Sequence, residues 1–393
     1  MTAHAVFLVL AVLAWVSLAI WLVLLIGRGG FWRMNLRLPE AEDGSRAWPA
    51  VTAVIPARDE AAVLPSTLPS VLAQDYPGAL TIIVVDDAST DGTGEVAAGL
   101  AAAATGTAEL RVVRGAGPPP GWAGKVAAMD RGMREVDPGS DYVLFTDSDI
   151  AHPADSLRRL VRHAQDERLD LVSLMARLST DSAAERMIVP AFVYSFFQLY
   201  PPAWVRRPGA RTAAAAGGCM LVRREMLDAV GGLAGISAAR IDDVALGTLL
   251  KRGGGRIWLG VTTGVRSLRP YPRLADLWDM IARSAYTQLR YSPWLLLGTV
   301  VGLVFTYGLP VVLGVVGLVT QRWWGLALPA LGAWAVMSAS YLPVLRLYGL
   351  RWWRAPLLPG VMTLYGAMTV DSARRHRQGR GGSWKGRVIE SAE

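Results

Sequence analysis

Short strand-like runs that alternate with helix-like stretches constrain the fold of this chain more than any other feature of its sequence. The strand-like runs are Val51–Ile55, Leu80–Val85, Glu109–Arg114 and Tyr142–Thr146. The helix-like stretches are Glu60–Gln74, Gly94–Ala104 and Lys125–Glu135. Strands that alternate with helices in this way form a parallel sheet with helices on its faces. We therefore expect an α/β domain of the doubly wound, Rossmann-like kind over residues 48–271.

Apolar sequence is concentrated at the two ends of the chain, and hydrophobic residues make up 52% of its 393 residues. Ala5–Ile26 carries no charge and is long enough to cross a bilayer. A cleaved signal peptide would have a basic start and a small-residue cleavage site, so we interpret residues 1–27 as a retained transmembrane signal anchor. By the positive-inside rule, the arginines that follow it, Arg28, Arg33 and Arg37, predict that its C-terminal side lies in the cytoplasm.

Further apolar runs predict a membrane region over residues 293–372. Trp294–Val319 and Trp324–Leu345 are each long enough to span. Ala355–Val370 is shorter and contains prolines and a glycine. A third crossing would place the basic tail, residues 373–393, outside the cell and against the charge rule. We therefore expect this short segment to be re-entrant or interfacial.

Two other stretches mix apolar, aromatic and charged residues, and their location stays open. Met187–Val205 contains several prolines, and Leu274–Tyr291 carries arginines between its apolar positions. Either stretch could lie on a membrane surface or form ordinary core helices. We assign residues 272–292 to an interfacial segment.

Charge and cysteine content exclude several classes of function. The formal net charge is +8, and the arginines are grouped beside apolar segments. This grouping favours a membrane surface over a nucleic acid as the partner. The single cysteine, Cys219, excludes an internal disulfide and a cysteine-based zinc site. The scattered histidines give no zinc-type cluster.

Polar clusters directly follow the predicted strands. They are Pro56–Glu60, Asp86–Thr93, Gly121–Lys125 and Asp147–Asp149. In open parallel sheets, ligands bind beyond the carboxyl ends of the strands. Since all four clusters fall at such ends, we expect them to form one ligand site.

The last of these clusters predicts a metal site. Asp147 and Asp149 are two residues apart, so both carboxylates point to one side if the strand register continues. Two carboxylates, together with water and phosphate oxygens, suit Mg²⁺ or Mn²⁺. Such a metal would bridge two phosphates and neutralise a leaving group. The alternative is a solvated Asp-Ser-Asp turn, and the position after a strand favours the metal.

The second and third clusters suit a nucleotide. Carboxylates of Asp86 and Asp87 can accept hydrogen bonds from a base or a ribose. Alternatively, Ser89, Thr90 and Asp91 could cap the following helix. Both interpretations can hold together. Lys125 is one of few lysines in an arginine-rich chain, and a compact ammonium suits a diphosphate.

At this point the clusters resemble the motifs of the inverting family 2 glycosyltransferases. Pro56-Ala-Arg-Asp-Glu60 is similar to the family's Pro-x-x-Asn-Glu, with Asp in place of Asn. Gly217-Gly-Cys-Met220 is similar to its acceptor loop, and Asp242-Asp243 to its acidic pair. The Gln-x-x-Arg-Trp motif is altered, because Tyr291 replaces Trp and Gln288 sits one place late.

The resemblance implies a GT-A fold and a role for each matching residue. Asp243 would be the general base that takes a proton from the acceptor hydroxyl, and Asp242 would tune its pKa by like-charge repulsion. The residues that would contact the nucleotide-sugar are Pro56, Arg58, Glu60, Asp86, Asp87, Lys125, Asp147, Ser148, Arg290 and Tyr291. Those on the acceptor side would be Gly217, Gly218, Cys219 and Asp242, and the metal ligands Asp147 and Asp149.

Each of these residues also has a purely structural interpretation. Asp242 and Asp243 could simply begin a helix, where carboxylates are favourable. Arg290 and Tyr291 could be an interfacial arginine and a membrane-belt aromatic. Cys219 is interpreted as a small packing residue of the acceptor loop rather than as a nucleophile.

Three stretches most resemble the hopene-associated glycosyltransferases, a bacterial branch of the family. They are Gly121–Lys125, Thr146–Pro153 and Thr287–Ser292. This resemblance implies transfer from a UDP-sugar, or secondarily a GDP-sugar, to a lipid hydroxyl such as a hopanoid, at the cytoplasmic face of the bacterial inner membrane. A processive polysaccharide synthase is one alternative, but it usually has more spans and an intact Gln-x-x-Arg-Trp motif. A non-catalytic scaffold is another, but a degenerate site would have lost its carboxylates.

Overall fold

The structure, a computed structural model, describes residues 3–40, 47–104 and 106–380. The described part of the chain divides into two compact units. The first, here called the sheet unit, takes residues 35–179 and 204–270. The second, the helical unit, takes residues 3–34, 180–203 and 271–380. The sequence predicts one continuous domain over 48–271, whereas residues 180–203 leave it for the helical unit.

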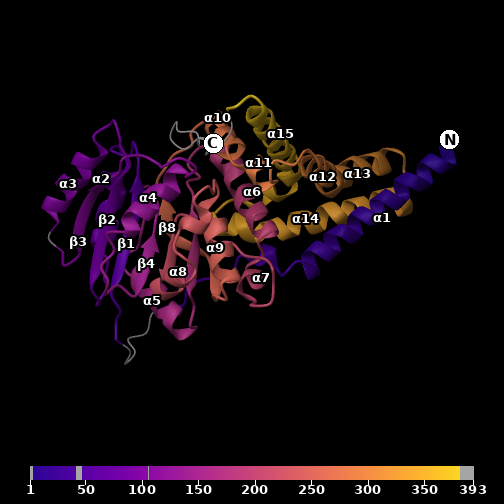
Figure 1. The fold of residues 1–393 in the computed structure, drawn as a ribbon. Coiled ribbons are helices and arrows are strands. Elements are labelled where there is room, and N and C mark those ends of the chain that lie inside the picture. The colour runs from indigo at the N-terminus through magenta and orange to yellow at the C-terminus, as the bar shows by residue number, and fades with distance from the viewer. Residues whose placement is uncertain (1–2, 41–46, 105, 381–393) are drawn as a thin grey trace. The chain divides into compact units, whose positions relative to one another are not determined.

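The sheet unit is built on one sheet with the strand order β3-β2-β1-β4-β7-β6-β8-β5 (Figure 1). The strands are β1 (Val51–Ala57), β2 (Leu80–Asp86), β3 (Glu109–Arg114), β4 (Tyr142–Phe145), β5 (Ile150–Ala151), β6 (Leu171–Arg177), β7 (Met220–Arg223) and β8 (Ile257–Ser267). The first four are parallel neighbours, which confirms the predicted strand–helix alternation. β7 runs antiparallel to β4 and β6, so the complete sheet is mixed.

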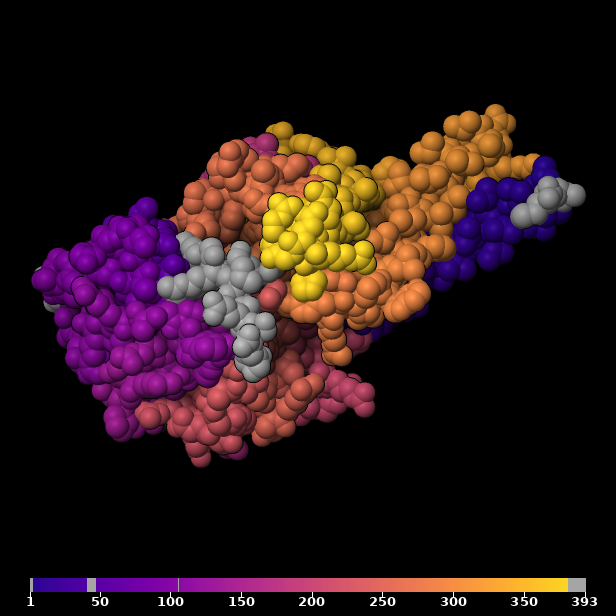
Figure 2. Space-filling view, turned by 45° about the horizontal axis from the view of Figure 1, so that its top comes forward, coloured from indigo at the N-terminus to yellow at the C-terminus, as the bar shows by residue number. Residues whose placement is uncertain are grey.

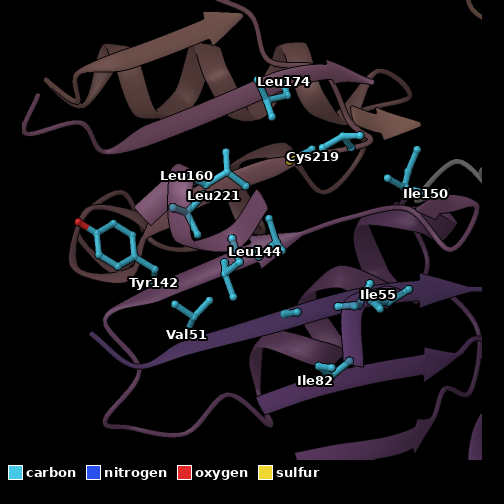
Figure 3. Close-up of a cluster of buried hydrophobic side chains, with 14 of the residues drawn as sticks. Val51, Ile55, Ile82, Tyr142, Leu144, Ile150, Leu160, Leu174, Cys219 and Leu221 are labelled. Carbon is cyan, nitrogen blue, oxygen red and sulfur yellow. The ribbon is translucent and has the colours of Figure 1, made fainter. Parts of the chain in front are cut away.

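Helices cover this sheet because its central strands are apolar along their whole length, as strands buried on both faces must be. The helices are α2 (Leu64–Leu72), α3 (Thr93–Ala103), α4 (Gly124–Met133), α5 (Ser156–Asp166), α7 (Pro202–Arg206), α8 (Arg224–Ala229) and α9 (Asp242–Arg252). Every residue of β1 is buried. Figure 3 shows the core, where Val51 and Ile55 of β1 and Leu144 of β4 share a cluster with Leu160 of α5. The strands therefore hold their carboxyl ends, and the loops that follow them, in fixed register.

The helical unit contains the apolar helices. Its main helices are α1 (Ala3–Gly27), α6 (Ala183–Leu199), α10 (Leu274–Ala282), α11 (Ala285–Gln288), α12 (Pro293–Leu303), α13 (Leu309–Val319), α14 (Leu328–Leu347) and α15 (Leu358–Arg377). Short 3₁₀ or π turns lie at Phe31–Arg33, Val304–Gly308, Trp323–Ala327 and Trp352–Leu357. Three helical segments are long and apolar enough to cross a membrane: Ala3–Gly27, Pro293–Val319 and Trp323–Leu347. They coincide with the predicted runs.

Helix α15 differs from these three because polar side chains tie it to α10 of the same unit. Trp278 Nε1 donates a hydrogen bond to Asp371 at 2.9 Å. Arg375 forms ion pairs with Asp279 at 2.7 Å and with Asp371 at 2.8 Å. In Figure 2 the yellow surface of α15 adjoins the orange surface of α10. These contacts hold the C-terminal end of α15, beyond Ala355–Val370, so the expectation that this segment does not cross a membrane stays a prediction.

Met187–Val205 and Leu274–Tyr291, whose location the sequence leaves open, both contain helices that pack on the protein. In α6, Ile188, Val189, Tyr194 and Phe197 are fully buried, which favours the core-helix interpretation. In α10, Leu277, Ile281 and Ala282 are buried and Asp279 is exposed, which also favours packing on protein. Residues 41–46 and residues 381–393 of the predicted basic tail lie outside the described part of the chain.

Candidate active site

The loops that follow β1 and β2 are joined by hydrogen bonds at the predicted edge of the sheet. The Asp59 amide donates to Ser89 Oγ at 3.0 Å. The Glu60 amide donates to Thr93 Oγ1 at 2.8 Å. Helix α3 begins after Gly92, and its first amide, that of Thr93, donates to Asp91 Oδ1 at 3.0 Å. Asp91 therefore caps this helix, whereas Ser89 holds the neighbouring loop. These bonds fix the backbone of both loops before any ligand binds.

The predicted nucleotide contacts from β1 and β2 lie together on these loops. Pro56 is a buried residue of β1 itself. The Arg58 guanidinium donates to the backbone oxygen of Asp87 at 2.7 Å. Asp86 accepts from the Ser89 amide at 3.1 Å, and Asp87 is 2% exposed. The structure therefore brings Arg58, Asp86 and Asp87 to one place, as the sequence predicts for adjacent parallel strands.

Thr146, the residue before Asp147, links the metal motif to the acceptor loop. Its hydroxyl donates to the backbone oxygen of Gly218 at 2.8 Å and lies 2.9 Å from His152 Nε2. Because the single hydroxyl proton is used on Gly218, His152 must carry its proton on Nε2 and donate to Thr146. Burial lowers the pKa of His152 to about 4, which keeps the ring neutral. No pattern along the chain indicates this link, because His152 is one of a few scattered histidines.

Lys125 lies among carboxylates rather than apart from them. Its Nζ is 2.7 Å from Asp147 Oδ1 and 3.0 Å from Asp242 Oδ2. Burial opposes the charge, but Asp147 and Asp242 raise the pKa of Lys125 above its usual range, so the ammonium persists. The lysine predicted to meet a diphosphate thus also joins the metal motif of β4 to the acidic pair of α9.

Asp243 is held in place by backbone amides. The Gly217 amide donates to Oδ2 at 2.9 Å, and the Val244 amide donates to Oδ1 at 2.7 Å. Burial, and then the neighbouring Asp242, raise the pKa of Asp243 to about 7. Helix α9 begins at Asp242 with no side-chain cap, so the helix-start alternative is limited to the favourable charge at a helix N-terminus. A carboxylate whose pKa lies near neutrality is suited to general-base work.

Asp149 is held by two residues that the sequence did not single out. Its Oδ2 accepts from Ser267 Oγ at 2.9 Å and from Arg269 Nε at 3.1 Å. Arg269 also donates to Glu60 Oε1 at 2.5 Å, so Glu60, a predicted nucleotide contact, holds an arginine in this structure. The strand that ends at Ser267, β8, was not predicted, and for that reason its carboxyl end could not be placed at this edge.

Ser148 and Cys219 are enclosed by protein. Ser148 is buried, and its backbone oxygen accepts from Thr67 Oγ1 at 2.6 Å. Cys219 is fully buried, and Figure 3 shows it among the core side chains of Leu174 and Leu221. Burial raises the pKa of the Cys219 thiol to about 12, so the sulfur is a protonated packing group, as predicted.

Arg290 and Tyr291 belong to the helical unit. Both have positive φ, 50° and 57°, which is uncommon for residues other than glycine. Tyr291 stacks on His376, with ring centroids 4.3 Å apart and planes 18° apart. Tyr286 Oη donates to the Tyr291 backbone oxygen at 2.7 Å. Their contact with a donor diphosphate stays a prediction.

A divalent cation fits the charge of this site. The acids of the cluster are Glu60, Asp147, Asp149, Asp242 and Asp243, and the bases are Lys125 and Arg269. Five acids against two bases leave an excess of negative charge, and desolvation together with neighbouring acids raises the pKa of Asp147 to about 6. In the described residues no three acids, histidines or cysteines gather at metal-ligand spacing. Water and phosphate oxygens would complete the shell, as is usual for Mg²⁺.

Gly217 provides the space in which Lys125 meets the carboxylates. A Cβ at this position would lie 3.2 Å from Lys125 Nζ and 3.5 Å from Asp243 Oδ2. We expect Gly217→Ala to displace both groups by a few tenths of an ångström and to lower kcat/KM about tenfold. The measurement is steady-state transfer kinetics.

The matched control for this change is Gly209→Ala in the same connecting segment. A Cβ at Gly209 meets nothing within 4 Å, so this variant should keep wild-type kinetics. Equal kcat/KM values for the two variants would contradict the close packing at Gly217.

Comparisons with known proteins show the family and the fold of the chain. The sequence profile described as "Glycosyltransferase like family 2" matches residues 49–287. No curated protein matches the chain. Among solved structures, the chain is similar to a mannosyltransferase from Pyrobaculum calidifontis in complex with GDP-Man and Mn²⁺, with 20% identity, a TM-score of 0.55, and coverage of 93% of this chain and 99% of that one. Glucosyl-3-phosphoglycerate synthase from Mycobacterium tuberculosis, with Mn²⁺ and UDP-Glc, is similar at 22% identity and a TM-score of 0.40, with coverage of 62% and 78%.

Proposed function

We propose a specific reaction for this chain, which belongs to glycosyltransferase family 2. It transfers a sugar from a nucleotide-sugar to the hydroxyl of a lipid, with inversion at the anomeric carbon. A UDP-sugar is the first donor to test and a GDP-sugar the second. One observation carries the proposal. Lys125 forms ion pairs with Asp147 of the metal motif and with Asp242, the neighbour of Asp243. One ammonium therefore links the residues proposed to bind the donor to those proposed to activate the acceptor.

Each residue of the cluster has a step to perform. Asp243 Oδ takes the proton of the acceptor hydroxyl, and the freed oxygen attacks the anomeric carbon as its bond to the diphosphate breaks. The amides of Gly217 and Val244 keep this carboxylate oriented. Asp147 and Asp149 would hold a divalent cation, Mg²⁺ or Mn²⁺, which when bound neutralises charge on the leaving diphosphate. Lys125 keeps Asp147 and Asp242 in register with each other.

The proposal of a lipid acceptor rests on the apolar helices. Three helical segments are long and apolar enough to cross a membrane. We place the sheet unit on the cytoplasmic side of a bacterial inner membrane, because arginines follow Ala3–Gly27 directly. With three crossings the chain after α14 returns to that same side, together with the arginines of α15, which agrees with the positive-inside rule. A hopanoid hydroxyl, suggested by the resemblance to the hopene-associated branch, is the first acceptor to test.

The deciding experiment incubates the purified full chain with radiolabelled UDP- and GDP-sugars, Mn²⁺ or Mg²⁺, and a hopanoid or polyprenyl-type acceptor in lipid nanodiscs. We expect one labelled lipid product that carries a single sugar. A labelled polymer would instead indicate a processive synthase. Absence of both transfer and donor hydrolysis with every nucleotide-sugar would overturn the proposal.

A further inference from the structure

Arg269 lies between two acidic side chains that come from different parts of the sheet edge. Its Nε donates to Asp149 Oδ2 at 3.1 Å, and its terminal nitrogen donates to Glu60 Oε1 at 2.5 Å. Glu60 follows β1, Asp149 follows β4, and Arg269 follows β8. The planar fork of an arginine can hold two carboxylates in fixed directions, which a lysine ammonium cannot do.

The carboxylates of this arrangement are more enclosed than the arginine between them. The side chains of Glu60 and Asp149 are 7% and 12% exposed, and that of Arg269 is 32% exposed. A carboxylate withdrawn from water needs a partner, because its desolvation is otherwise uncompensated. Arg269 supplies that partner to both acids, so the arrangement is expected to be rigid.

Among the described residues, the hydrogen bonds to the Asp149 side chain fall on one of its two oxygens. Ser267 Oγ, at 2.9 Å, and Arg269 Nε both donate to Oδ2. The Asp149 backbone is fixed as well, since its carbonyl oxygen accepts from the Leu268 amide at 2.8 Å. With Oδ2 committed to two donors and the backbone fixed, the plane of the carboxylate is set, and Oδ1 is the oxygen that a cation would meet.

We propose that Arg269, buttressed by Glu60 and assisted by Ser267, is a positioning residue that orients the Asp149 carboxylate for a divalent cation. This inference rests on the proposed function, in which Asp147 and Asp149 are the metal ligands. It reassigns Glu60 from contacting the nucleotide-sugar to supporting a metal ligand through an arginine. Side chains that orient metal ligands in this way commonly change metal affinity about 10- to 100-fold when they are replaced.

A rival role for Arg269 predicts the opposite result. If its guanidinium took the place of a metal and neutralised Asp149 in the catalytic state, then its removal would free the carboxylate and strengthen metal binding. The two roles therefore differ in the sign of the change in metal affinity.

The test measures binding of Mn²⁺ alone to the detergent-solubilised full chain, by electron paramagnetic resonance of free Mn²⁺, without donor or acceptor. We expect Arg269→Gln to raise the Kd for Mn²⁺ by about 10- to 100-fold. Arg269→Lys keeps the charge but not the fork, so its Kd should fall between those of the wild type and Arg269→Gln. Glu60→Gln can still accept a hydrogen bond from Arg269, and we expect the smallest change there.

The matched control is Arg223→Gln, which breaks another ion pair with a buried acid in the same unit. Arg223 lies 2.6 Å from Asp170, whose side chain is 8% exposed, at the opposite end of β4 from Asp147. This variant should lose stability to a similar degree but keep the wild-type Kd for Mn²⁺. If Arg269→Gln does not fold, Ser267→Ala removes one of the two donors and should still raise the Kd several-fold.

The outcomes separate this inference from the proposed function. Unchanged or tighter Mn²⁺ binding in Arg269→Gln and Ser267→Ala, with a wild-type chain that binds Mn²⁺, would overturn the positioning role and leave the metal site in place. A wild-type chain that does not bind Mn²⁺ would overturn the assignment of Asp147 and Asp149 as ligands, and the positioning role with it.

Discussion

Replacing Asp243 by Asn is expected to lower kcat about 10³-fold, within the range usual for loss of a general base. The amide keeps the size of the side chain and can still accept a hydrogen bond from the Gly217 amide, which lies 2.9 Å from Oδ2. It cannot take a proton from an acceptor hydroxyl. The donor contacts are not altered, so the Kd for the nucleotide-sugar, measured by calorimetry, should stay close to the wild-type value.

The pH profile of the wild-type enzyme gives an independent check on the same residue. Burial and the adjacent Asp242 raise the pKa of Asp243 to about 7, and only the ionised form can act as a base. kcat/KM should therefore rise as the pH increases through neutrality and level off above it. This rising limb should be missing from Asp243→Asn. The surface variant Asp228→Asn alters an exposed acid of the same unit. It should keep the wild-type kcat and the rise of kcat/KM with pH.

The sequence predicted which loops share the carboxyl edge of β1 to β4, because that edge depends on local order. β1 to β4 are successive strands of one parallel arrangement, so the residue after each strand had to reach the same edge. Asp86, Asp147 and Asp149 could be placed from the strand pattern alone.

What the sequence did not reveal depends on pairings across long separations. Arg269 meets Glu60 across more than half the length of the chain, and the pairing of β8 with β6 and with β5 brings it to this edge. Lys125 was predicted as a diphosphate ligand, because no pattern along the chain shows that Asp242 lies 3.0 Å from it. The sequence also did not show that residues 180–203 belong to the helical unit. A buried helix and an interfacial helix share the same apolar, aromatic composition, so composition could not distinguish them.

Replacing Lys125 by Met is expected to destabilise the sheet unit and to abolish most activity. The Lys125 Nζ lies 2.7 Å from Asp147 and 3.0 Å from Asp242. With Met at this position, the carboxylates of Asp147, Asp242 and Asp243 would lie close together with no cation between them. Removing one partner of a buried ion pair costs about 3 to 5 kcal/mol, and the partial exposure of Asp147 favours the lower end. The corresponding fall in thermal midpoint is about 6 to 12 °C for a domain of this size.

The size of this loss should depend on pH in a defined direction. Asp147 and Asp243 already have pKa values raised above those of the unfolded chain, and removal of the ammonium raises them further. An acid with a raised folded-state pKa destabilises the fold where it is ionised, so the deficit should be full at about pH 8 and shrink as the pH falls toward 5. Thermal unfolding of the variant and the wild type at both pH values measures this difference.

Lys251→Met is the control that separates lost charge pairing from lost packing. The Lys251 ammonium donates to backbone oxygens of Trp204, Val205 and Thr212, at 3.1, 2.7 and 2.7 Å. Because these partners are neutral carbonyls, the stability lost in Lys251→Met should be the same at both pH values. If Lys125→Met showed an equally constant deficit, its ammonium would be a packing group, and the Asp147 carboxylate would not depend on it for its charge. A deficit that shrinks in acid for Lys125→Met alone would identify the ammonium as the group that keeps the two halves of the site ionised together.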